Sequence, residues 1–326
     1  MCIRDRPASR NYRPNDLEPV VALLNAADVV DKTEDGTSLE ETRTRFQTPG
    51  FNPEQNVFVA EDRTEHLVGY ADIRLAKELT ENAFRTWFQI HPNDRGHELE
   101  EHLLARLYAR AEERLSECDT AVVSFDSFTN VTAHWRIEAL ERFGMHELRR
   151  FWLMVRPDLE NLVQPQFPPG VTTRAYRVKE DDIVMHATDT QVFRDHWGHT
   201  EEPLEHWQHY VAWAAFKPDL TVIAENTVSR EIAGYCSILI NEDENGRLGV
   251  RRGWIDILGV RRPYRKHGLG TALLLAGLYN MREDGVQQAA LGTDSENLTG
   301  ATRIYERVGF VVRHTRAAYR KPMRDV

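Results

Sequence analysis

Two stretches of this chain, 165 residues apart, follow the same plan, and this repeat constrains the fold more than any other feature. Residues 57–75 (VFVAEDRTEHLVGYADIRL) and residues 221–240 (TVIAENTVSREIAGYCSILI) each place apolar runs on both sides of a polar turn, the pattern of a β-hairpin. Gly69 and Gly234 occupy the same place in the two hairpins. We therefore expect two domains of one type, joined in tandem.

The two halves stay in step after the hairpins. Each continues with an apolar strand, a loop with an arginine, a helix, another strand and a short helix that ends at a glycine, Gly144 or Gly309. Apolar residues share one face of the long helix in each half: Leu99, Leu103, Leu107 and Ala111 in the first, and Leu274, Leu278 and Met281 in the second. These elements predict an α+β (α/β) fold for both domains.

Composition marks the boundaries between the domains. Residues 157–170 contain four prolines and have the composition of a linker. We predict an N-terminal domain at 11–156 and a C-terminal domain at 171–326. Residues 1–10 lack the apolar segment of a secretory signal, so they read as a disordered extension or a cloning scar and are left out of the fold prediction.

Charge and cysteine content narrow the classes of function. The net charge of −10 argues against nucleic acid as the main partner, because phosphate binding needs a basic surface. No apolar run is long enough to span a membrane, so we expect no membrane partner. Three cysteines lie far apart without a Cys-x-x-Cys pair, which indicates reduced thiols in a cytoplasm. A monomer and a homodimer are both compatible with this composition.

The strongest local signal is a glycine loop between a strand and a helix in the second half. In WIDILGVRRPYRKHGLGTALLLAGLY, Gly268 and Gly270 let the backbone approach a ligand closely, and Arg265 adds positive charge. The first amides of the following helix have no partner within the helix, so the loop suits a pyrophosphate. The loop is neither a Walker A motif nor a dinucleotide fingerprint. A simple glycine turn is the alternative interpretation.

The surrounding residues resemble the GNAT N-acetyltransferase superfamily. The loop matches that family's pyrophosphate motif, Arg265-x-x-Gly268-x-Gly270, and the resemblance extends over most of residues 254–310. The second signature helix is matched by Asn297, Ala301, Tyr305-Glu306 and Gly309-Phe310. The resemblance implies a central mixed, mostly antiparallel sheet flanked by helices in each domain. The tandem layout is similar to that of two-domain members such as mycothiol synthase-like proteins.

The resemblance also implies acetyl-CoA as the co-substrate and direct transfer to the amine of a small-molecule acceptor. Tyr305 is then expected near the sulfur, where it protonates the leaving thiolate. An amide near Val260 is expected to polarise the thioester carbonyl. The expected cofactor-binding residues are Leu258, Gly259, Val260, Arg265, Lys266, His267, Gly268, Leu269, Gly270, Thr271 and Asn297.

A base must take a proton from the acceptor amine, and Asp256 is our candidate. Family members usually carry a glutamate at the position of Trp254, and some carry the acid two residues later. Residues 254, 256 and 258 share one face of a strand, so Asp256 is expected to point to the acceptor. The alternatives are an acid at a strand bulge for Asp256 and a core aromatic for Tyr305.

Residues 192–210, VFRDHWGHTEEPLEHWQHY, are expected to cover the acceptor. They are rich in aromatic and acidic side chains, which suits a cationic or polar amine. The predicted substrate-binding residues are His196, Trp197, Asp256 and Thr293. The same segment has the pairs His196-x-x-His199 and His206-x-x-His209, which suggest Zn²⁺ or Ni²⁺, but Gly198 and Pro203 interrupt the run. We therefore predict no metal site.

The first copy lacks the parts that carry the chemistry. Aligned on Ile90 and Val260, it has Arg95 in the loop but Glu98 and Glu100 on the two glycine positions. Leu140 stands where the second half has Tyr305, and Thr86 where it has Asp256. The carboxylates repel a pyrophosphate, so the N-terminal domain is predicted to be a degenerate copy that shapes the acceptor cleft or supports its neighbour. A non-catalytic acyl-CoA-binding sensor or scaffold is the alternative function, and transfer to oxygen or sulfur is a further one.

Overall fold

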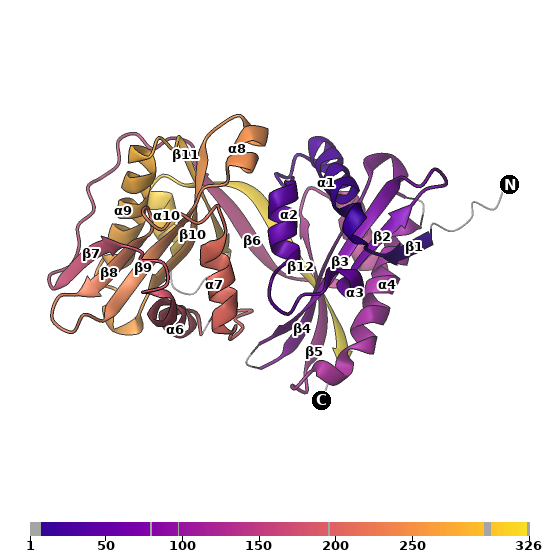
Figure 1. Ribbon diagram of the computed structural model, residues 1–326, viewed down its shortest axis with the longest axis horizontal. Coiled ribbons are helices and arrows are strands. Elements are labelled where there is room, and N and C mark those ends of the chain that lie inside the picture. The colour runs from indigo at the N-terminus through magenta and orange to yellow at the C-terminus, as the bar shows by residue number, and fades with distance from the viewer. Residues whose placement is uncertain (1–7, 79, 97, 195, 297–300, 325–326) are drawn as a thin grey trace. The chain divides into compact units, whose positions relative to one another are not determined.

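The computed structural model divides into two compact units. Unit 1 comprises the residues up to Arg150 together with those from Thr315 onward, and unit 2 comprises Phe151–His314. Figure 1 shows the helices and strands of both units. The structure describes residues 8–78, 80–96, 98–194, 196–296 and 301–324.

Unit 1 is a mixed, mostly antiparallel sheet flanked by helices. Its described strands lie in the order β1-β2-β3-β4-β5-β12, and only β4 and β5 run parallel. These strands are β1 (Ala8–Asn11), β2 (Val57–Glu61), β3 (Leu67–Lys77), β4 (Asn82–Ile90), β5 (Val123–Asn130) and β12 (Val311–Arg324). The α-helices are α1 (Leu17–Asp31), α2 (Leu39–Phe46), α3 (Pro53–Asn56), α4 (Leu99–Glu113) and α5 (His134–Arg142), with short 3-10 turns at Pro14–Asp16, Pro92–Asp94 and Leu115–Glu117.

Unit 2 repeats this architecture. Its described strands lie in the order β7-β8-β9-β10-β11-β6, and only β10 and β11 run parallel. These strands are β6 (His146–Arg156), β7 (Val171–Ala175), β8 (Val222–Asn226), β9 (Ile232–Leu239), β10 (Arg252–Val260) and β11 (Gln288–Asp294). The helices are α6 (Asp182–Phe193), α7 (Leu204–Ala212), α8 (Glu242–Leu248), α9 (Leu269–Glu283) and α10 (Ala301–Arg307), with a 3-10 turn at Arg262–Tyr264. The predicted fold class is confirmed.

The sixth strand of each sheet comes from the opposite half of the sequence. In unit 1, β12 at the end of the chain pairs with β5 across Arg316–Arg324. In unit 2, β6 pairs with β11 across Phe151–Arg156. This division differs from the domains expected at 11–156 and 171–326, because the closing strands are exchanged between the two copies.

A truncated protein that ends at His314 tests whether the observed units or the domains expected from the sequence are the independent folding units. We expect this truncation to destabilise unit 1, because it removes the partner of β5 and the buried side chains Ala317 and Tyr319. Amide hydrogen exchange should show faster exchange in α4, in unit 1, and unchanged protection in α9, in unit 2. If residues 171–326 instead form a self-contained domain, α9 loses protection and α4 keeps it.

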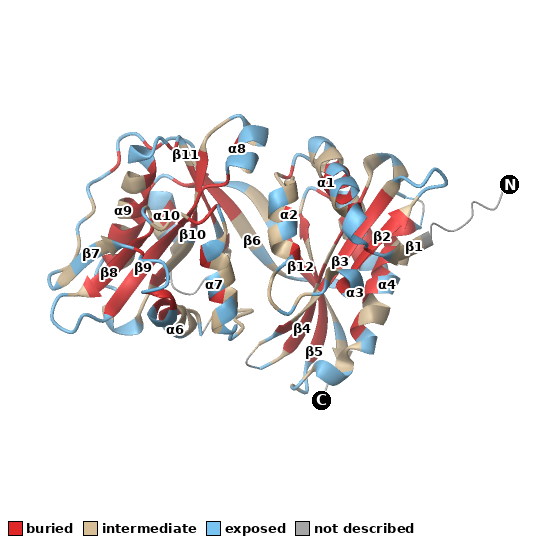
Figure 2. Cartoon of the chain, viewed as in Figure 1, coloured by how far each residue is buried: buried red, intermediate tan, exposed pale blue. Residues whose placement is uncertain are grey.

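The long helices bury the faces that the sequence predicts. Leu103 and Leu107 of α4 and Leu278 and Met281 of α9 have no exposed surface, and Figure 2 shows the buried strands that they cover. The short helices end at Gly144 and Gly309 with φ of 81° and 92°, the left-handed conformation expected at a helix C-terminus.

Two segments differ from their sequence-based descriptions. Residues 8–10 were set aside with the N-terminal extension, yet they belong to β1, which pairs with β2. Residues 157–170 contain no helix or strand, as expected of a linker. Within that stretch Leu159 and Leu162 are buried in the core of unit 2, and the Tyr279 hydroxyl donates to the Leu162 carbonyl at 2.7 Å. The segment is therefore packed against its own unit.

Candidate active site

The site begins where β10 and β11 part. The two strands pair only from Arg252↔Gln288 to Trp254↔Ala290, whereas β10 continues beside β9 as far as Val260. The Arg261 amide donates a hydrogen bond to the Ala233 carbonyl. Because amides along an antiparallel strand point alternately toward and away from the neighbouring strand, the amides of Leu258 and Val260 point away from β9. Among the described strands, none covers this edge of β10. An extended ligand can therefore pair with it as an added strand.

A β-bulge places Asp256 at the opening. The register of β10 against β9 shifts between Ile255 and Ile257, so Asp256 is the extra residue. A bulge redirects side chains out of the regular alternation. Solvent reaches the Asp256 carboxylate from the opening, although protein atoms surround it closely. The bulge expected as the alternative is present, and Asp256 also lines the cavity, so its role as a base stays a prediction.

A cavity of about 1190 Å³ opens between the parted strands of unit 2. Its walls come from β10 and β11, the glycine loop, the start of α9, α10, and the segment of α6 and α7. A volume of this size accommodates an extended cofactor arm together with an acceptor. The predicted site residues that line it are His196, Trp197, Asp256, Leu258, Val260, Arg265, Lys266, Gly268, Gly270, Thr271, Thr293 and Tyr305.

Three of the predicted residues that the structure describes do not line the cavity. Gly259 faces the protein, where a Cβ atom would lie 2.8 Å from the Tyr235 ring. Leu269 is a core residue, and His267 is exposed outside the cavity wall. Asn297 lies outside the described residues. Gly259 and Leu269 are therefore candidates through their backbone atoms alone.

The glycine loop has the geometry of an anion site. Lys266 and Gly268 take left-handed conformations with φ of 66° and 82°, and α9 starts directly after Gly268 without a side-chain cap. The amides of the first turn of α9 therefore remain available, and the helix dipole favours a negative charge there. A Cβ atom at Gly268 would meet nothing within 4 Å. The space beside this glycine is open to a ligand.

Arg265 lines the cavity, but its guanidinium mainly binds backbone carbonyls and so holds the loop in place. Its Nε donates to the Val260 carbonyl at 2.8 Å, and its Nη2 donates to the Val192 carbonyl at 3.0 Å. These bonds tie the end of β10 and the end of α6 to the loop. The sequence motif predicted the arginine, but its side chain serves mainly to position the backbone that would bind phosphate.

Tyr305 lies in the cavity wall on α10 and is 8% exposed. Burial raises its pKa to about 12, with Cys236 as a smaller contribution. The phenol is therefore protonated at neutral pH. Among the described residues, its hydroxyl has no hydrogen-bond partner, so it is available to a ligand in the cavity.

Two carboxylate–tyrosine pairs lie at the cavity, which is lined by Asp189, Tyr210 and Asp256. The Tyr210 hydroxyl donates to Asp256 Oδ2 at 2.9 Å and also contacts the Ser237 hydroxyl. The Tyr235 hydroxyl donates to Asp189. Burial raises the pKa of Asp256, the hydrogen bond from Tyr210 opposes this shift, and Asp189 adds to it. Burial likewise raises the pKa of Asp189.

Sequence reasoning missed Asp189. It lies on α6 and reaches the cavity because this helix packs against β9, on which Tyr235 stands. The signal in the sequence was weak, since one acid in an amphipathic helix is usually a surface residue. Tyr210 belonged to the predicted acceptor segment, but its bond to Asp256 spans 46 residues and leaves no local trace.

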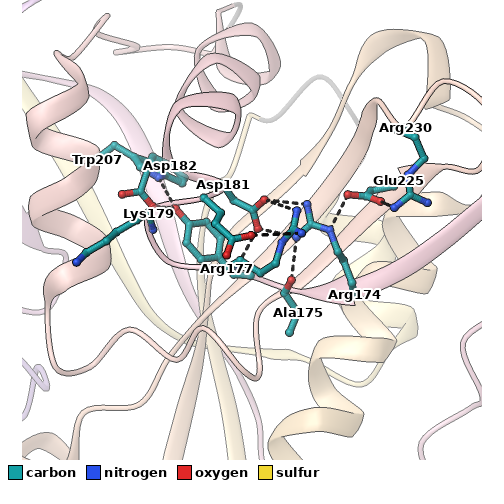
Figure 3. A network of polar contacts seen from close by, with 11 residues as sticks. Arg174, Ala175, Arg177, Lys179, Asp181, Asp182, Trp207, Glu225 and Arg230 are labelled. Carbon is teal, nitrogen blue, oxygen red and sulfur yellow. Dashed lines mark hydrogen bonds and ion pairs between the residues drawn. The ribbon is translucent and has the colours of Figure 1, made fainter.

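A polar network anchors α6 and α7 to the sheet (Figure 3). Arg174 on β7 binds Asp181 and Glu225, each at 2.6 Å. Behind it, the Tyr176 hydroxyl donates to Asp182 and accepts a hydrogen bond from Trp207 on α7. This network fixes the two helices that carry Asp189 and Tyr210. In unit 1, Arg10 makes the same ion pairs with Asp16 and Glu61.

With this geometry established, the chain can be compared with known proteins. Residues 158–310 match the model of the acetyltransferase (GNAT) family. These residues are a GNAT acetyltransferase domain. The GNAT family uses acetyl-CoA as co-substrate, and N-acetyltransferase activity takes precedence over the non-catalytic sensor considered from the sequence.

Relatives of known function cover most of the chain. The mycothiol acetyltransferase of Saccharopolyspora erythraea is 29% identical over 270 residues, which are 79% of this chain and 83% of the relative. The mycothiol acetyltransferase of Streptomyces avermitilis is 28% identical over 308 residues, which are 94% of this chain and 92% of the relative. This chain is therefore similar to mycothiol acetyltransferases along both of its halves.

Solved structures confirm the tandem GNAT fold. A GCN5-related N-acetyltransferase from Sphaerobacter thermophilus has a TM-score of 0.79 at 24% identity, covering 100% of this chain and 99% of that one. A tandem GNAT protein from the clavulanic acid biosynthesis pathway has a TM-score of 0.68 at 14% identity, covering 97% and 98%. At these identities the likeness concerns the fold.

The corresponding loop of unit 1 is filled by its own side chain. Glu100 is 2% exposed, and its Oε1 accepts a hydrogen bond from the Gly96 amide at 2.7 Å. Glu98, at the position of Gly268, has a φ of 65°. The carboxylate of Glu100 therefore binds within the loop of unit 1, whereas the corresponding loop of unit 2 has Gly270 at this position. Arg95 pairs with Asp31 at 2.7 Å and, like Arg265, holds its loop.

Two further findings concern the described residues alone. They contain no group of three or more histidine, cysteine, aspartate or glutamate side chains arranged to hold a metal ion. None of their helices has the length and apolar character needed to cross a membrane.

Proposed function

We propose that the cavity of unit 2 transfers an acetyl group from acetyl-CoA directly to a primary amine of a small molecule. The observation that supports this most strongly is the open edge of β10 running from Asp256 to the glycine loop. In this arrangement the pantetheine arm pairs with the free amides of Leu258 and Val260. The pyrophosphate then lies against the loop amides at the start of α9.

The reaction follows from the groups around this edge. Asp256 accepts a proton from the acceptor ammonium, and the resulting amine attacks the thioester carbonyl carbon. The Val260 amide stabilises the oxyanion that forms as the C–N bond is made. The C–S bond then breaks, and the thiolate accepts a hydrogen bond from Tyr305. The nitrogen then releases its second proton to solvent, which leaves the neutral amide, and Asp256 returns its proton to solvent before the next cycle.

The raised pKa of Tyr305 defines its role more closely. A phenol with a pKa of about 12 does not give its proton outright to a thiolate whose conjugate thiol has a pKa of ~8.5. Tyr305 therefore acts as a hydrogen-bond donor that stabilises the leaving group, and solvent supplies the final proton.

The acceptor side suits a cationic amine. Asp189 and Asp256 carry the negative charge, and aromatic side chains such as Trp197 and Tyr210 surround them. Because the relatives are named mycothiol acetyltransferases, an acceptor related to mycothiol is our first choice of substrate class.

Calorimetric titration with acetyl-CoA tests the cofactor site, and release of free thiol in the presence of amines tests the reaction. We expect one acetyl-CoA site per chain and amine-dependent thiol release. Two sites would show that Glu100 does not close the loop of unit 1. Binding without thiol release for any amine would leave a non-catalytic acyl-CoA-binding protein, and the absence of binding would refute the proposal.

The pH profile distinguishes the roles of the two carboxylates. Because the base must be ionised, the raised pKa of Asp256 places the acid limb of kcat above the range of an ordinary aspartate, ~3.9. Asp189→Asn removes a negative neighbour and makes Asp256 easier to ionise, so the limb should move to lower pH. Measurement of kcat against pH checks this shift. An unchanged acid limb of kcat in Asp189→Asn would show that Asp189 does not influence the ionisation of the base.

A further inference from the structure

Unit 1 contains a small cavity at the place where unit 2 has its large one. Its volume is about 230 Å³, less than a fifth of the 1190 Å³ in unit 2. The parallel pairing of β4 and β5 ends at Thr86↔Ser127, and the cavity lies directly beyond, lined by Trp87 and Phe128 to Asn130. It is too small for acetyl-CoA, so any ligand here belongs to another class.

Arg136, on α5, lines this cavity. It is 2% exposed, and its guanidinium lies over the rings of Trp87, Phe88 and Trp135 at 5.1, 5.5 and 4.9 Å from their centroids. Among the described residues, it has no hydrogen-bond or ion-pair partner. The rings attract the cation but accept none of its five N–H donors.

The charge of Arg136 persists at neutral pH. Burial lowers its pKa to about 10, and this shift is opposed by Asp35 and Asp31. A buried cation without a hydrogen-bonded partner destabilises a fold, because it has lost its hydration and nothing replaces it. An anion bound to the Arg136 guanidinium would offset this unfavourable free energy.

The other polar groups of the cavity point to the same ligand chemistry. Arg45 Nε and Asn130 Nδ2 are buried donors that lack a partner among the described residues. Arg45 and Arg316 also line the cavity, and the described lining contains one acid, Asp35, which pairs with Arg316. Three arginines against one aspartate leave a net charge of +2.

We propose that this cavity binds a small oxyanion, a carboxylate or a phosphate, with Arg136 as its principal partner. A guanidinium fork matches both groups in a bidentate geometry. The Asn130 amide and the free Nε of Arg45 supply further donors. Leu24, Trp87 and Phe128 form apolar walls that leave room for the small body of an organic acid. This site is independent of the acetyl-transfer cavity in unit 2.

Thermal unfolding of the full-length protein with sodium phosphate or sodium benzoate, at matched ionic strength against sodium chloride, tests the proposal. We expect at least one of the two oxyanions to raise the Tm of the wild type beyond the effect of chloride. A response to benzoate alone identifies a carboxylate site, and a response to phosphate alone identifies a phosphate site. Equal Tm values in all three salts would overturn the proposal.

Arg136→Met gives the sharper result, because it removes the charge and keeps the length of the side chain. Without an oxyanion the variant should be more stable than the wild type, since an unpaired buried charge is gone. With the oxyanion it should show no extra stabilisation. The same oxyanion response in the variant and the wild type would contradict the assignment.

Two further variants guard against indirect effects. Arg316→Met changes a half-exposed arginine of the same lining, so it should weaken the response about tenfold in ligand concentration, or by about 1.4 kcal/mol. Arg13→Met changes an exposed arginine of unit 1 outside the lining and should leave the response intact. Loss of the response in Arg13→Met would indicate a general charge effect and refute a specific site.

Discussion

Replacing Gly270 by glutamate should weaken acetyl-CoA binding roughly 100-fold and lower thiol release with it. Gly270 corresponds to Glu100, whose carboxylate accepts a hydrogen bond from Gly96 four residues earlier. A Cβ atom at Gly270 would meet Val260 Cγ2 at 3.6 Å, an ordinary contact, so the fold accepts a side chain here. The new carboxylate should accept a hydrogen bond from the Lys266 amide and occupy the position proposed for phosphate.

The expected loss is about 3 kcal/mol, or roughly 100-fold in affinity, because charge-assisted hydrogen bonds to phosphate are replaced by an internal one. Calorimetric titration with acetyl-CoA measures it directly. Gly270→Gln is the matched control, since it has the same size without the charge, and should bind more tightly than Gly270→Glu. Wild-type affinity in Gly270→Glu would show that phosphate lies elsewhere.

Replacing Asp256 by asparagine should lower kcat by roughly 100- to 10,000-fold, the usual contribution of a positioned general base. The amide still accepts a hydrogen bond from Tyr210 but takes no proton from the acceptor ammonium. Affinity for acetyl-CoA should stay close to that of the wild type, because the proposed contact with the cofactor involves the backbone beyond this residue. Steady-state kinetics and calorimetry on the same preparation check both statements.

The pH profile shows whether such a loss comes from missing basicity. The acid limb of kcat should disappear in Asp256→Asn, and activity should recover in part at high pH, where the free amine is abundant in solution. In the wild type, the hydrogen bond from Tyr210 lowers the pKa of Asp256. Tyr210→Phe keeps the carboxylate but removes this bond, so the pKa of Asp256 rises and the acid limb of kcat should move to higher pH. Full activity of Asp256→Asn at neutral pH would place the base on another group.

The fold was largely predictable from the sequence, whereas the cofactor side of the site stays a prediction. The repeat predicted two copies, and the glycine loop predicted an anion site at the start of α9. Both signals are local, because a short run of backbone conformations determines them. The same holds for Glu98 and Glu100, whose positions in the loop predict that the first copy has lost its phosphate site.

The acceptor side depends on contacts that are distant in sequence. Asp189 and Tyr235 meet because α6 packs on β9, and Tyr210 reaches Asp256 across 46 residues. A single sequence contains no trace of such pairs. The role of Arg265 was also hidden, since a motif predicts the residue type at a position but not the direction of its side chain.

The exchange of the closing strands was beyond sequence reasoning for another reason. Residues 146–156 and 311–324 are both β-strands that follow a short helix and a glycine. Since the two copies share one design, either strand suits either sheet by pattern alone. Only the packing of the complete chain distinguishes the two pairings.

This exchange has a consequence for synthesis on the ribosome. The part of β12 that completes unit 1 begins at Thr315, so the first sheet stays open until the ribosome has passed all of unit 2. Until then the edge of β5 is unpaired, and such an edge invites pairing with other nascent chains. Unit 2 receives its closing strand, β6, before its other strands are made. Although unit 1 is encoded first, it is the last to be completed.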